Sequence, residues 1–323
     1  MPCRIVSTLL FLSAALQACM VYAQESAEAY PSKPVRVIAS QAPGGTDVQA
    51  RLYAIKLSES LGRQFIIDNR PGLNIALPLV ARSAPDGYTL LVVVPSFNFA
   101  SALYKNLPVD PIKDFAPISL MSRAPYLLVV NSSLPVRSVQ QLISLAKAHP
   151  GKLNFGAGLQ GTGTHFISAW FMSLANIKAT YVPYKGVAQA VIDVVAGQID
   201  AGFSTAVPLL PHIKSGRLRA LGISTGQRST LFPDIATIAE QGVRGFDAST
   251  FHGWSAPAGT PPAIINKLSA ELARIAKLPD VADSLKADNS ESVGSTPEQF
   301  RQFIAAEVPR WRKLVQDTGI KVE

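Results

Sequence analysis

Residues 35–61 read VRVIASQAPGGTDVQARLYAIKLSESL, which is a short apolar run, a glycine-rich turn and a longer helical run. We expect a strand at Val35–Ala39 and a helix from Val48 to Leu61, with Gly62 as its C-cap. A strand, a helix and a further strand then follow, at residues 65–67, 75–83 and 89–94. This βαβαβ order predicts a mainly parallel sheet covered by helices.

A second unit of similar plan begins at Tyr126. Strands are expected at residues 126–130, 152–155, 179–182, 199–203 and 218–224, and helices at 138–148, 164–174 and 187–196. The C-terminal part differs, because it reads as two long helices, the second opened by a capping box at Ser295–Glu298. We expect these helices to pack back onto an existing sheet rather than to form a third domain.

A glycine-rich turn joins a strand to a helix in each unit, at Ala42–Asp47 and at Gly156–His165. A helix N-terminus carries unpaired N–H groups and the positive end of the helix dipole, so such a junction can bind an anion. The alternative for the first turn is that Thr46 or Asp47 only caps the helix. Two such junctions favour a ligand site between the units, beyond the carboxyl ends of the strands.

Candidate sites for cofactors and catalysis are weak. Gly156, Gly158 and Gly161 match the pattern GxGxxG, but the region about 20 positions on, 178–184, has no carboxylate to bind a ribose. The four histidines form no metal-binding pattern, and Gly202–Ala206 departs from GxSxG in its last residue. We therefore expect no cofactor, no metal and no catalytic residue, and a protein that is not an enzyme.

The N-terminus has the layout of a secretory signal peptide. Arg4 precedes the uncharged apolar stretch 5–23, and small residues stand at the −3 and −1 positions before Gln24. We expect cleavage near Ala23 and export to the periplasm. The alternatives are an uncleaved membrane span and a lipoprotein attached through Cys19. Both cysteines of the chain, Cys3 and Cys19, lie within residues 1–23, so the mature chain would contain no disulfide.

The size and charge of the chain limit its partners. Its 323 residues suffice for two domains. Lys and Arg number 30 against 22 Asp and Glu, and the net charge is +8. The basic residues are scattered, and the tightest cluster, Arg310–Lys313, reads as the solvated face of a helix, so we expect no nucleic-acid partner. A mild positive field favours encounter with small anions.

A series of short motifs runs in order along almost the whole mature chain. They occur at residues 30–36, 42–47, 68–72, 84–91, 103–108, 113–117, 150–155, 161–165, 182–186, 216–221, 256–261 and 293–300. In this series the chain resembles the Bug family, the periplasmic receptors of tripartite tricarboxylate transporters. The resemblance is specific because no single motif carries it.

The resemblance implies an α/β protein with the two-domain periplasmic-binding-protein fold, a type II-like Venus flytrap with two interdomain crossings. The expected boundaries are 1–23 for the signal peptide, 30–125 plus 252–323 for domain 1 and 126–251 for domain 2. The partners would be a small mono- or dicarboxylate and either membrane transporter subunits or a sensor protein, with the receptor itself a monomer. The expected ligand-binding residues are Ala42, Pro43, Gly44, Gly45, Thr46, Asp47, Ser96, Gly161, Thr162, Gly163, Thr164, His165, Tyr184, Ser204 and Thr205.

The sequence departs from the family at the loop Pro71–Ile75, which is shorter, and at Ala157, where a hydroxyl residue is common. Ser204 stands where some amino-acid-binding relatives have Asp, so a bound ammonium group would lack a carboxylate partner. We therefore expect a non-amino mono- or dicarboxylate, with an amino acid as the alternative. The choice between transport and signalling stays open, and an exported hydrolase on the same scaffold is the third reading.

Overall fold

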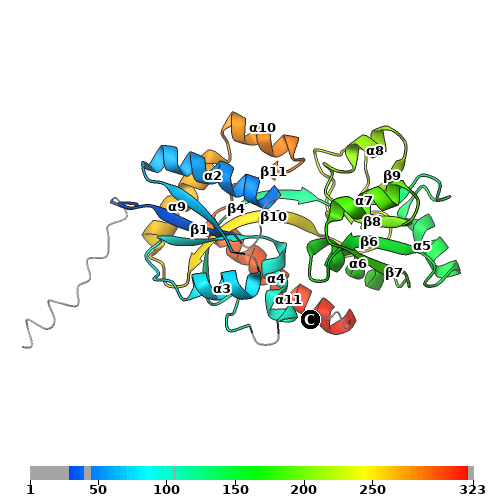
Figure 1. Cartoon of the computed structure of the whole chain (residues 1–323), viewed down its shortest axis with the longest axis horizontal. Helices are drawn as coiled ribbons and strands as arrows, with labels where there is room; N and C mark the ends of the chain where they lie inside the picture. The colour runs from blue at the N-terminus through cyan, green and yellow to red at the C-terminus, as the bar shows by residue number, and fades with distance from the viewer. Residues whose placement is uncertain (1–28, 40–44, 71, 105–106, 319–323) are drawn as a thin grey trace, which may run out of the picture.

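The structure is a computed structural model that describes residues 29–39, 45–70, 72–104 and 107–318. The expected signal peptide and the turn residues Ala42, Pro43 and Gly44 lie outside the described residues. The described chain forms two β-sheets, each with helices packed against it (Figure 1). We call the six-stranded sheet with its helices the first lobe, and the five-stranded sheet with its helices the second lobe.

The first sheet has the strand order β11-β4-β10-β3-β1-β2. Its strands are β1 (Val35–Ala39), β2 (Phe65–Asn69), β3 (Thr89–Val93), β4 (Phe115–Pro125), β10 (Ser249–Pro257) and β11 (Glu291–Ser292). β1 pairs in parallel with β2 and β3, but β10 is antiparallel to β3 and β4, and β11 is antiparallel to β4. The expected mainly parallel sheet is therefore mixed, because β10 returns from the second lobe and inserts between β3 and β4.

The second sheet has the order β7-β6-β8-β5-β9. Its strands are β5 (Leu127–Asn131), β6 (Asn154–Gly158), β7 (Thr180–Tyr184), β8 (Ala201–Ser204) and β9 (Leu218–Ile223). β6 is parallel to β7 and β8, whereas β5 is antiparallel to β8 and β9. Each lobe thus combines a parallel group of three strands with antiparallel strands, and β4, β5 and β10 are the strands next to the crossings between the lobes.

The helices of the first lobe are α2 (Gly45–Leu61), α3 (Leu73–Ala81), α4 (Pro95–Leu103), α9 (Pro262–Ile275), α10 (Pro279–Ala287) and α11 (Pro297–Thr318). Those of the second lobe are α5 (Val139–Ala148), α6 (Gly163–Leu174), α7 (Val187–Val195) and α8 (Leu210–Lys214).

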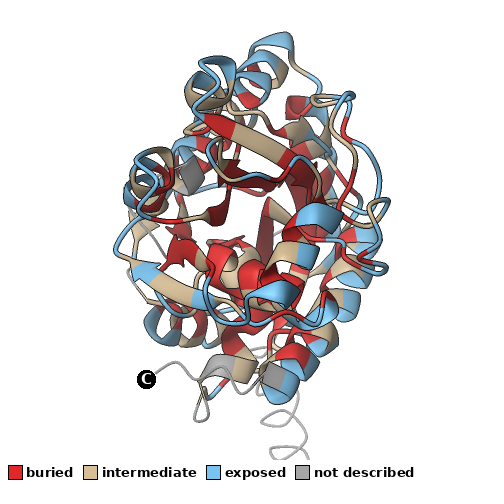
Figure 2. Cartoon of the chain, turned by 90° about the vertical axis from the view of Figure 1, so that its right-hand side faces the viewer, coloured by how far each residue is buried: buried red, intermediate tan, exposed pale blue. Residues whose placement is uncertain are grey.

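Both faces of the first sheet are covered. Val37 packs with the core under α2 and α9, whereas its neighbour Ile38 packs with the core under α3, α4 and α11. Successive strand residues point to opposite faces, so a strand covered on both sides must be apolar throughout. Figure 2 shows the result, with buried strands inside and exposed residues on the outer turns of helices and on loops.

Two predicted helix ends are confirmed, and one is shifted. Gly62 has the positive φ of a C-cap, 69°, and the Ser138 hydroxyl accepts a hydrogen bond from the Gln141 N–H at 3.2 Å. The capping box of α11 begins one residue later than expected. Thr296 and Gln299 form it, since each backbone N–H donates to the side chain of the other, at 2.9 and 3.2 Å.

The C-terminal helix α11 packs on β4 and α4 of the first lobe, as expected for a helix that returns to an existing sheet. Its last turns, however, reach the core of the second lobe. The Trp311 ring lies with its centroid 4.7 Å from that of Phe99 in α4, and 5.2 Å from that of Trp170 in α6. α11 therefore joins the two cores through aromatic packing.

The chain crosses between the lobes twice, once from β4 into β5 and once from the segment after β9 into β10. The two crossings are held side by side by Ser224. Its hydroxyl accepts a hydrogen bond from the Tyr126 N–H at 2.9 Å and donates one to the Ala248 carbonyl at 2.6 Å. The expected α/β architecture of two lobes with two crossings is therefore present.

Candidate functional site

The carboxyl ends of the parallel strands in both lobes point toward the crossings. β3 runs parallel to β4 through their shared neighbour β10, so its carboxyl end lies on the side from which β4 enters the second lobe. In the second lobe Ser204, the last residue of β8, pairs with Leu127, the first residue of β5. Helices that start at these ends therefore begin near the boundary between the lobes.

Two of these helices touch across that boundary. α4 follows β3 and α6 follows β6, and the ring of Phe99 in α4 lies 4.3 Å from the ring of Phe166 in α6, centroid to centroid. Helix N-termini carry a partial positive charge and unpaired N–H groups. The junction that begins α6 thus faces a helix start of the first lobe, as a site between the lobes requires.

The first turn of α2 contains three of the predicted ligand-binding residues. Gly45 and Thr46 are the first residues of α2, and Asp47 lies in its first turn. The Asp47 carboxylate accepts hydrogen bonds from Arg51 at 2.8 Å and from Asn69 at 2.9 Å. These two bonds lower its pKa and keep it charged. Asp47 is thus engaged within the first lobe, as the sequence suggested.

Ser96, one of the expected ligand-binding residues, lies in the first turn of α4. The N-cap of this helix is Val94, whose side chain makes no capping hydrogen bond, and Ser96 is partly exposed. Two residues further on, Asn98 is fully buried, and neither its amide nitrogen nor its amide oxygen has a hydrogen-bond partner. The sequence-based prediction did not include Asn98, although a polar residue between Phe97 and Phe99 was a visible signal.

The second-lobe turn is stabilised by its own side chains. The Thr162 hydroxyl donates to the Leu159 carbonyl at 2.7 Å and caps α6, and the Thr164 hydroxyl accepts from the Gly158 N–H at 3.0 Å. Gly161, with φ 86°, donates its N–H to Nδ1 of His165 at 3.2 Å.

Within the described chain, the N–H groups of Gly163 and Thr164 have no hydrogen-bond partner. These two N–H groups lie at the N-terminus of the 12-residue helix α6, where unpaired donors stabilise an anion.

Gly163 also contacts the crossing. A Cβ added to it would lie 2.6 Å from the hydroxyl oxygen of Tyr126, the residue between β4 and β5. Tyr126 is buried, which raises the pKa of its hydroxyl to about 12. The first residue of α6 therefore rests against the first crossing, and a side chain larger than that of glycine would collide with the Tyr126 hydroxyl.

The remaining predicted residues lie at the ends of β7 and β8. The Tyr184 hydroxyl donates to the Asp193 carboxylate at 2.7 Å, and burial together with this carboxylate raises the pKa of Tyr184 to about 12. Ser204 is 1% exposed, and its hydroxyl has no partner. Thr205 follows it and is partly exposed. Of these three, Ser204 has a polar group left for a ligand inside the protein.

The electrostatics of the site favour neutral donors. Burial lowers the pKa of His165, so its imidazole stays neutral and its Nδ1 can accept from Gly161. In the part of the chain that the structure describes, no three His, Cys, Asp or Glu side chains gather as a metal site would need. The same residues include no helix with the length and apolar character to cross a bilayer.

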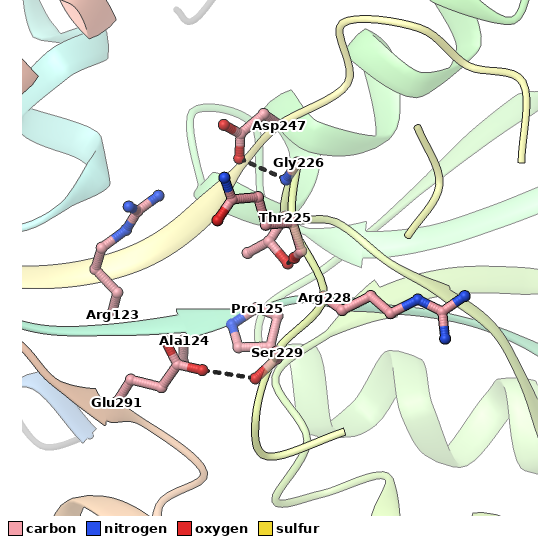
Figure 3. Close-up of a pocket in the computed structure, with 10 residues that line it drawn as sticks. Arg123, Ala124, Pro125, Thr225, Gly226, Arg228, Ser229, Asp247 and Glu291 are labelled. Atoms are coloured by element: carbon pink, nitrogen blue, oxygen red, sulfur yellow. Dashed lines mark hydrogen bonds between the residues drawn. The ribbon is translucent and has the colours of Figure 1, made fainter. Parts of the chain in front are cut away.

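A separate polar cavity of about 340 Å³ lies at the crossings (Figure 3). It is lined by Arg123, Ala124, Pro125, Thr225, Gly226, Gln227, Arg228, Ser229, Asp247 and Glu291. None of the predicted ligand-binding residues lines it. Glu291 of the first lobe accepts a hydrogen bond from the Ser229 hydroxyl of the second at 2.8 Å, so the cavity wall holds a direct link between the lobes.

Comparisons with known proteins agree with this geometry. The family described as tripartite tricarboxylate transporter family receptor matches residues 49–320. Protein BugT of Bordetella pertussis is 36% identical over 308 residues, which cover 94% of each chain.

Two solved structures contain a bound carboxylate. R. palustris Rpa4515 with adipate has a TM-score of 0.76 and 33% identity, over 90% of this chain and 99% of that one. MatC from Rhodopseudomonas palustris with bound malate has a TM-score of 0.74 and 30% identity, over 88% of this chain and 100% of that one. The expected flytrap fold is confirmed by these matches. The family model and the identity to BugT over nearly the whole chain lead to one conclusion: this protein belongs to the tripartite tricarboxylate transporter receptor family.

Proposed function

We propose that this protein is a periplasmic receptor that binds a small carboxylate between its two lobes and does no chemistry on it. The observation that carries the proposal is the contact of α4 with α6 across the lobes, which brings two helix N-termini to one region. Such N-termini stabilise anions. The adipate and malate bound to the two related structures support the same ligand class.

The proposed site combines groups of both lobes. In the second lobe we assign the free N–H groups of Gly163 and Thr164 and the hydroxyl of Ser204. In the first lobe we assign Ser96 at the start of α4, together with the turn 42–47. Thr162 and Tyr184 would then shape the site rather than donate to the ligand, because their hydroxyls donate within the second lobe. His165 accepts at Nδ1 from the Gly161 N–H, so its neutral ring carries the proton on Nε2, and we add this N–H to the donors that the second lobe offers to the ligand.

The proposed domains are 30–125 plus 252–323 and 126–251, closing on the ligand by a hinge motion at the crossings. The membership of the strands in two sheets supports these limits. Trp311 and Leu314 are exceptions to these domain limits. Both follow residue 252, yet their side chains pack in the core of the second lobe. The closing motion must therefore preserve or slide this aromatic contact.

The direct test is calorimetric titration of the protein lacking residues 1–23 with adipate, malate and their 2-amino analogues. We expect the non-amino acids to bind more tightly, because Ser204 cannot neutralise a buried ammonium group. Ser204→Ala should weaken binding by about tenfold or more if its hydroxyl donates to a carboxylate. Ser215→Ala, on an exposed turn of the same lobe, is the matched control. Absence of binding by every acid would refute the proposal, and turnover of a bound acid would favour the hydrolase.

Export and partnership need separate experiments. We propose that the chain is cleaved near Ala23, so the mass of periplasmic material should lack residues 1–23, whereas a diacylglycerol adduct on Cys19 would indicate a lipoprotein. We further propose that the receptor serves a tripartite transporter, in keeping with the family description. Loss of ligand uptake in cells lacking the receptor would support transport. Normal uptake with a lost transcriptional response would support the sensor alternative.

A further inference from the structure

Asn98 is a buried amide that the fold does not satisfy. Its exposed fraction is 0%, and neither Nδ2 nor Oδ1 has a hydrogen-bond partner. Buried polar groups in native proteins are almost always hydrogen-bonded, because an unpaired one loses its bonds to water without replacement. A leucine would fill similar space without this loss, so packing alone does not explain an asparagine here.

The position of Asn98 on α4 links it to the proposed site. Phe97 and Ala100 pack in the core of the first lobe, and Phe99 packs in the core of the second. Successive residues lie about 100° apart around a helix, so Asn98 occupies the sector between Phe97 and Phe99, where the two lobes meet. Helical side chains also point back toward the N-terminus, which directs the amide of Asn98 toward the uncapped first turn of α4.

The chemistry of an amide restricts what can satisfy it. Nδ2 donates and Oδ1 accepts. A carboxylate can only accept, so it satisfies Nδ2 and leaves Oδ1 unpaired. A hydroxyl group on the ligand, next to the carboxylate, supplies the missing donor without adding a charge.

We propose that Asn98 is a specificity-determining residue that recognises a hydroxyl group beside a carboxylate of the ligand, and that the receptor therefore prefers hydroxycarboxylates. This inference rests on the proposed function, because it requires a carboxylate between the lobes. A site built to bond a hydroxyl discriminates strongly against the analogue that lacks it, since its buried groups are then left unpaired.

The experiment compares two matched pairs of ligands, malate with succinate and 2-hydroxyadipate with adipate, by calorimetry. The wild-type protein should bind the hydroxylated member of at least one pair at least about tenfold more tightly. Asn98→Leu should reduce that ratio to about one, mainly by weakening the hydroxy acid. Ser101→Ala, on the same helix and only partly buried, is the control and should keep the wild-type ratio.

Thermal unfolding of the ligand-free variants separates this role from a structural one. Because the amide of Asn98 has no partner in the protein, Asn98→Leu should not lower the unfolding temperature. If the leucine variant does not fold, Asn98→Ala serves in its place. A wild-type protein without preference in either pair, or a variant that keeps the preference, overturns the inference while leaving the proposed function intact. If the wild-type protein binds none of the four acids, the proposed function itself fails. Tighter binding of the 2-amino analogue of succinate or adipate than of the hydroxy acid would mean that Oδ1 of Asn98 accepts from an ammonium group. That result would also overturn the inference.

Discussion

Gly163→Ala tests the contact between α6 and the crossing. The added Cβ would lie 2.6 Å from the Tyr126 hydroxyl oxygen and 3.6 Å from Cζ of the same ring, so the oxygen alone is too close. Overpacking of this kind costs about 1–3 kcal/mol. Replacing a glycine of ordinary φ by alanine returns about 0.4–1 kcal/mol through the unfolded chain. The middle values of these two ranges differ by about 1.3 kcal/mol, so we expect a net loss of about 1 kcal/mol in the free energy of unfolding.

The Tyr126→Phe background provides the control for this prediction. Phenylalanine lacks the oxygen, so the nearest ring atom is at ordinary van der Waals distance from the new methyl group. The single change Tyr126→Phe removes only the buried hydroxyl, so it should cost at most about 1.5 kcal/mol. In this background Gly163→Ala should be neutral or stabilising. Urea unfolding of the four proteins measures the coupling, and equal destabilisation in both backgrounds would refute the proposed clash.

Three further predictions concern pH, specificity and closure. Burial lowers the pKa of His252 from 6.5 to about 4, so on acidification the unfolded chain takes up a proton before the folded chain does. The folded state should lose about 2 kcal/mol between pH 7 and pH 5 from this group, and His252→Gln should remove that part of the slope in urea titrations; an unchanged slope would contradict the assignment. Ser204→Asp should shift the preference toward 2-amino acids, and a variant that still prefers the non-amino acid would argue against a ligand contact at β8. Small-angle scattering should show a smaller radius of gyration with saturating ligand, unless the free protein is already closed.

The sequence predicts best those elements whose pattern is local. The helix expected at 138–148 was placed correctly, because a serine followed by an amphipathic run is a local signal of a helix start. β4 and β10 were missed. β4 contains Pro117 and ends at Pro125, and in β10 the glycine at 253 breaks the apolar run. These strands exist because each pairs with the other along its length, which no local pattern records.

Gly253 illustrates why tertiary contacts escape such reasoning. A Cβ there would lie 2.3 Å from the ring of Phe300 in α11, a residue 47 positions later in the chain. The glycine is thus required by a helix that packs across the strand, and not by a turn.

The candidate site shows the same limit. The strand-to-helix junctions were placed correctly from glycine patterns, since those patterns are local. The sequence did not show which polar side chains would lack a hydrogen-bond partner in the folded protein. Thr162 and Thr164 bond within their own turn, whereas Ser204 and Asn98 have no partner. Whether a hydroxyl or an amide finds a hydrogen-bond partner depends on residues that only the folded chain brings together.

The aromatic contact of Trp311 has a consequence for how the chain acquires its structure. The core of the second lobe is built from residues in the middle of the sequence, yet Trp311 and Leu314 complete it. A ribosome adds these two residues after all five strands of the second lobe, so those strands are complete long before the core of that lobe can close. A fragment of residues 126–251 should therefore behave as a loosely packed intermediate, and full cooperativity should appear only when the final helix is present.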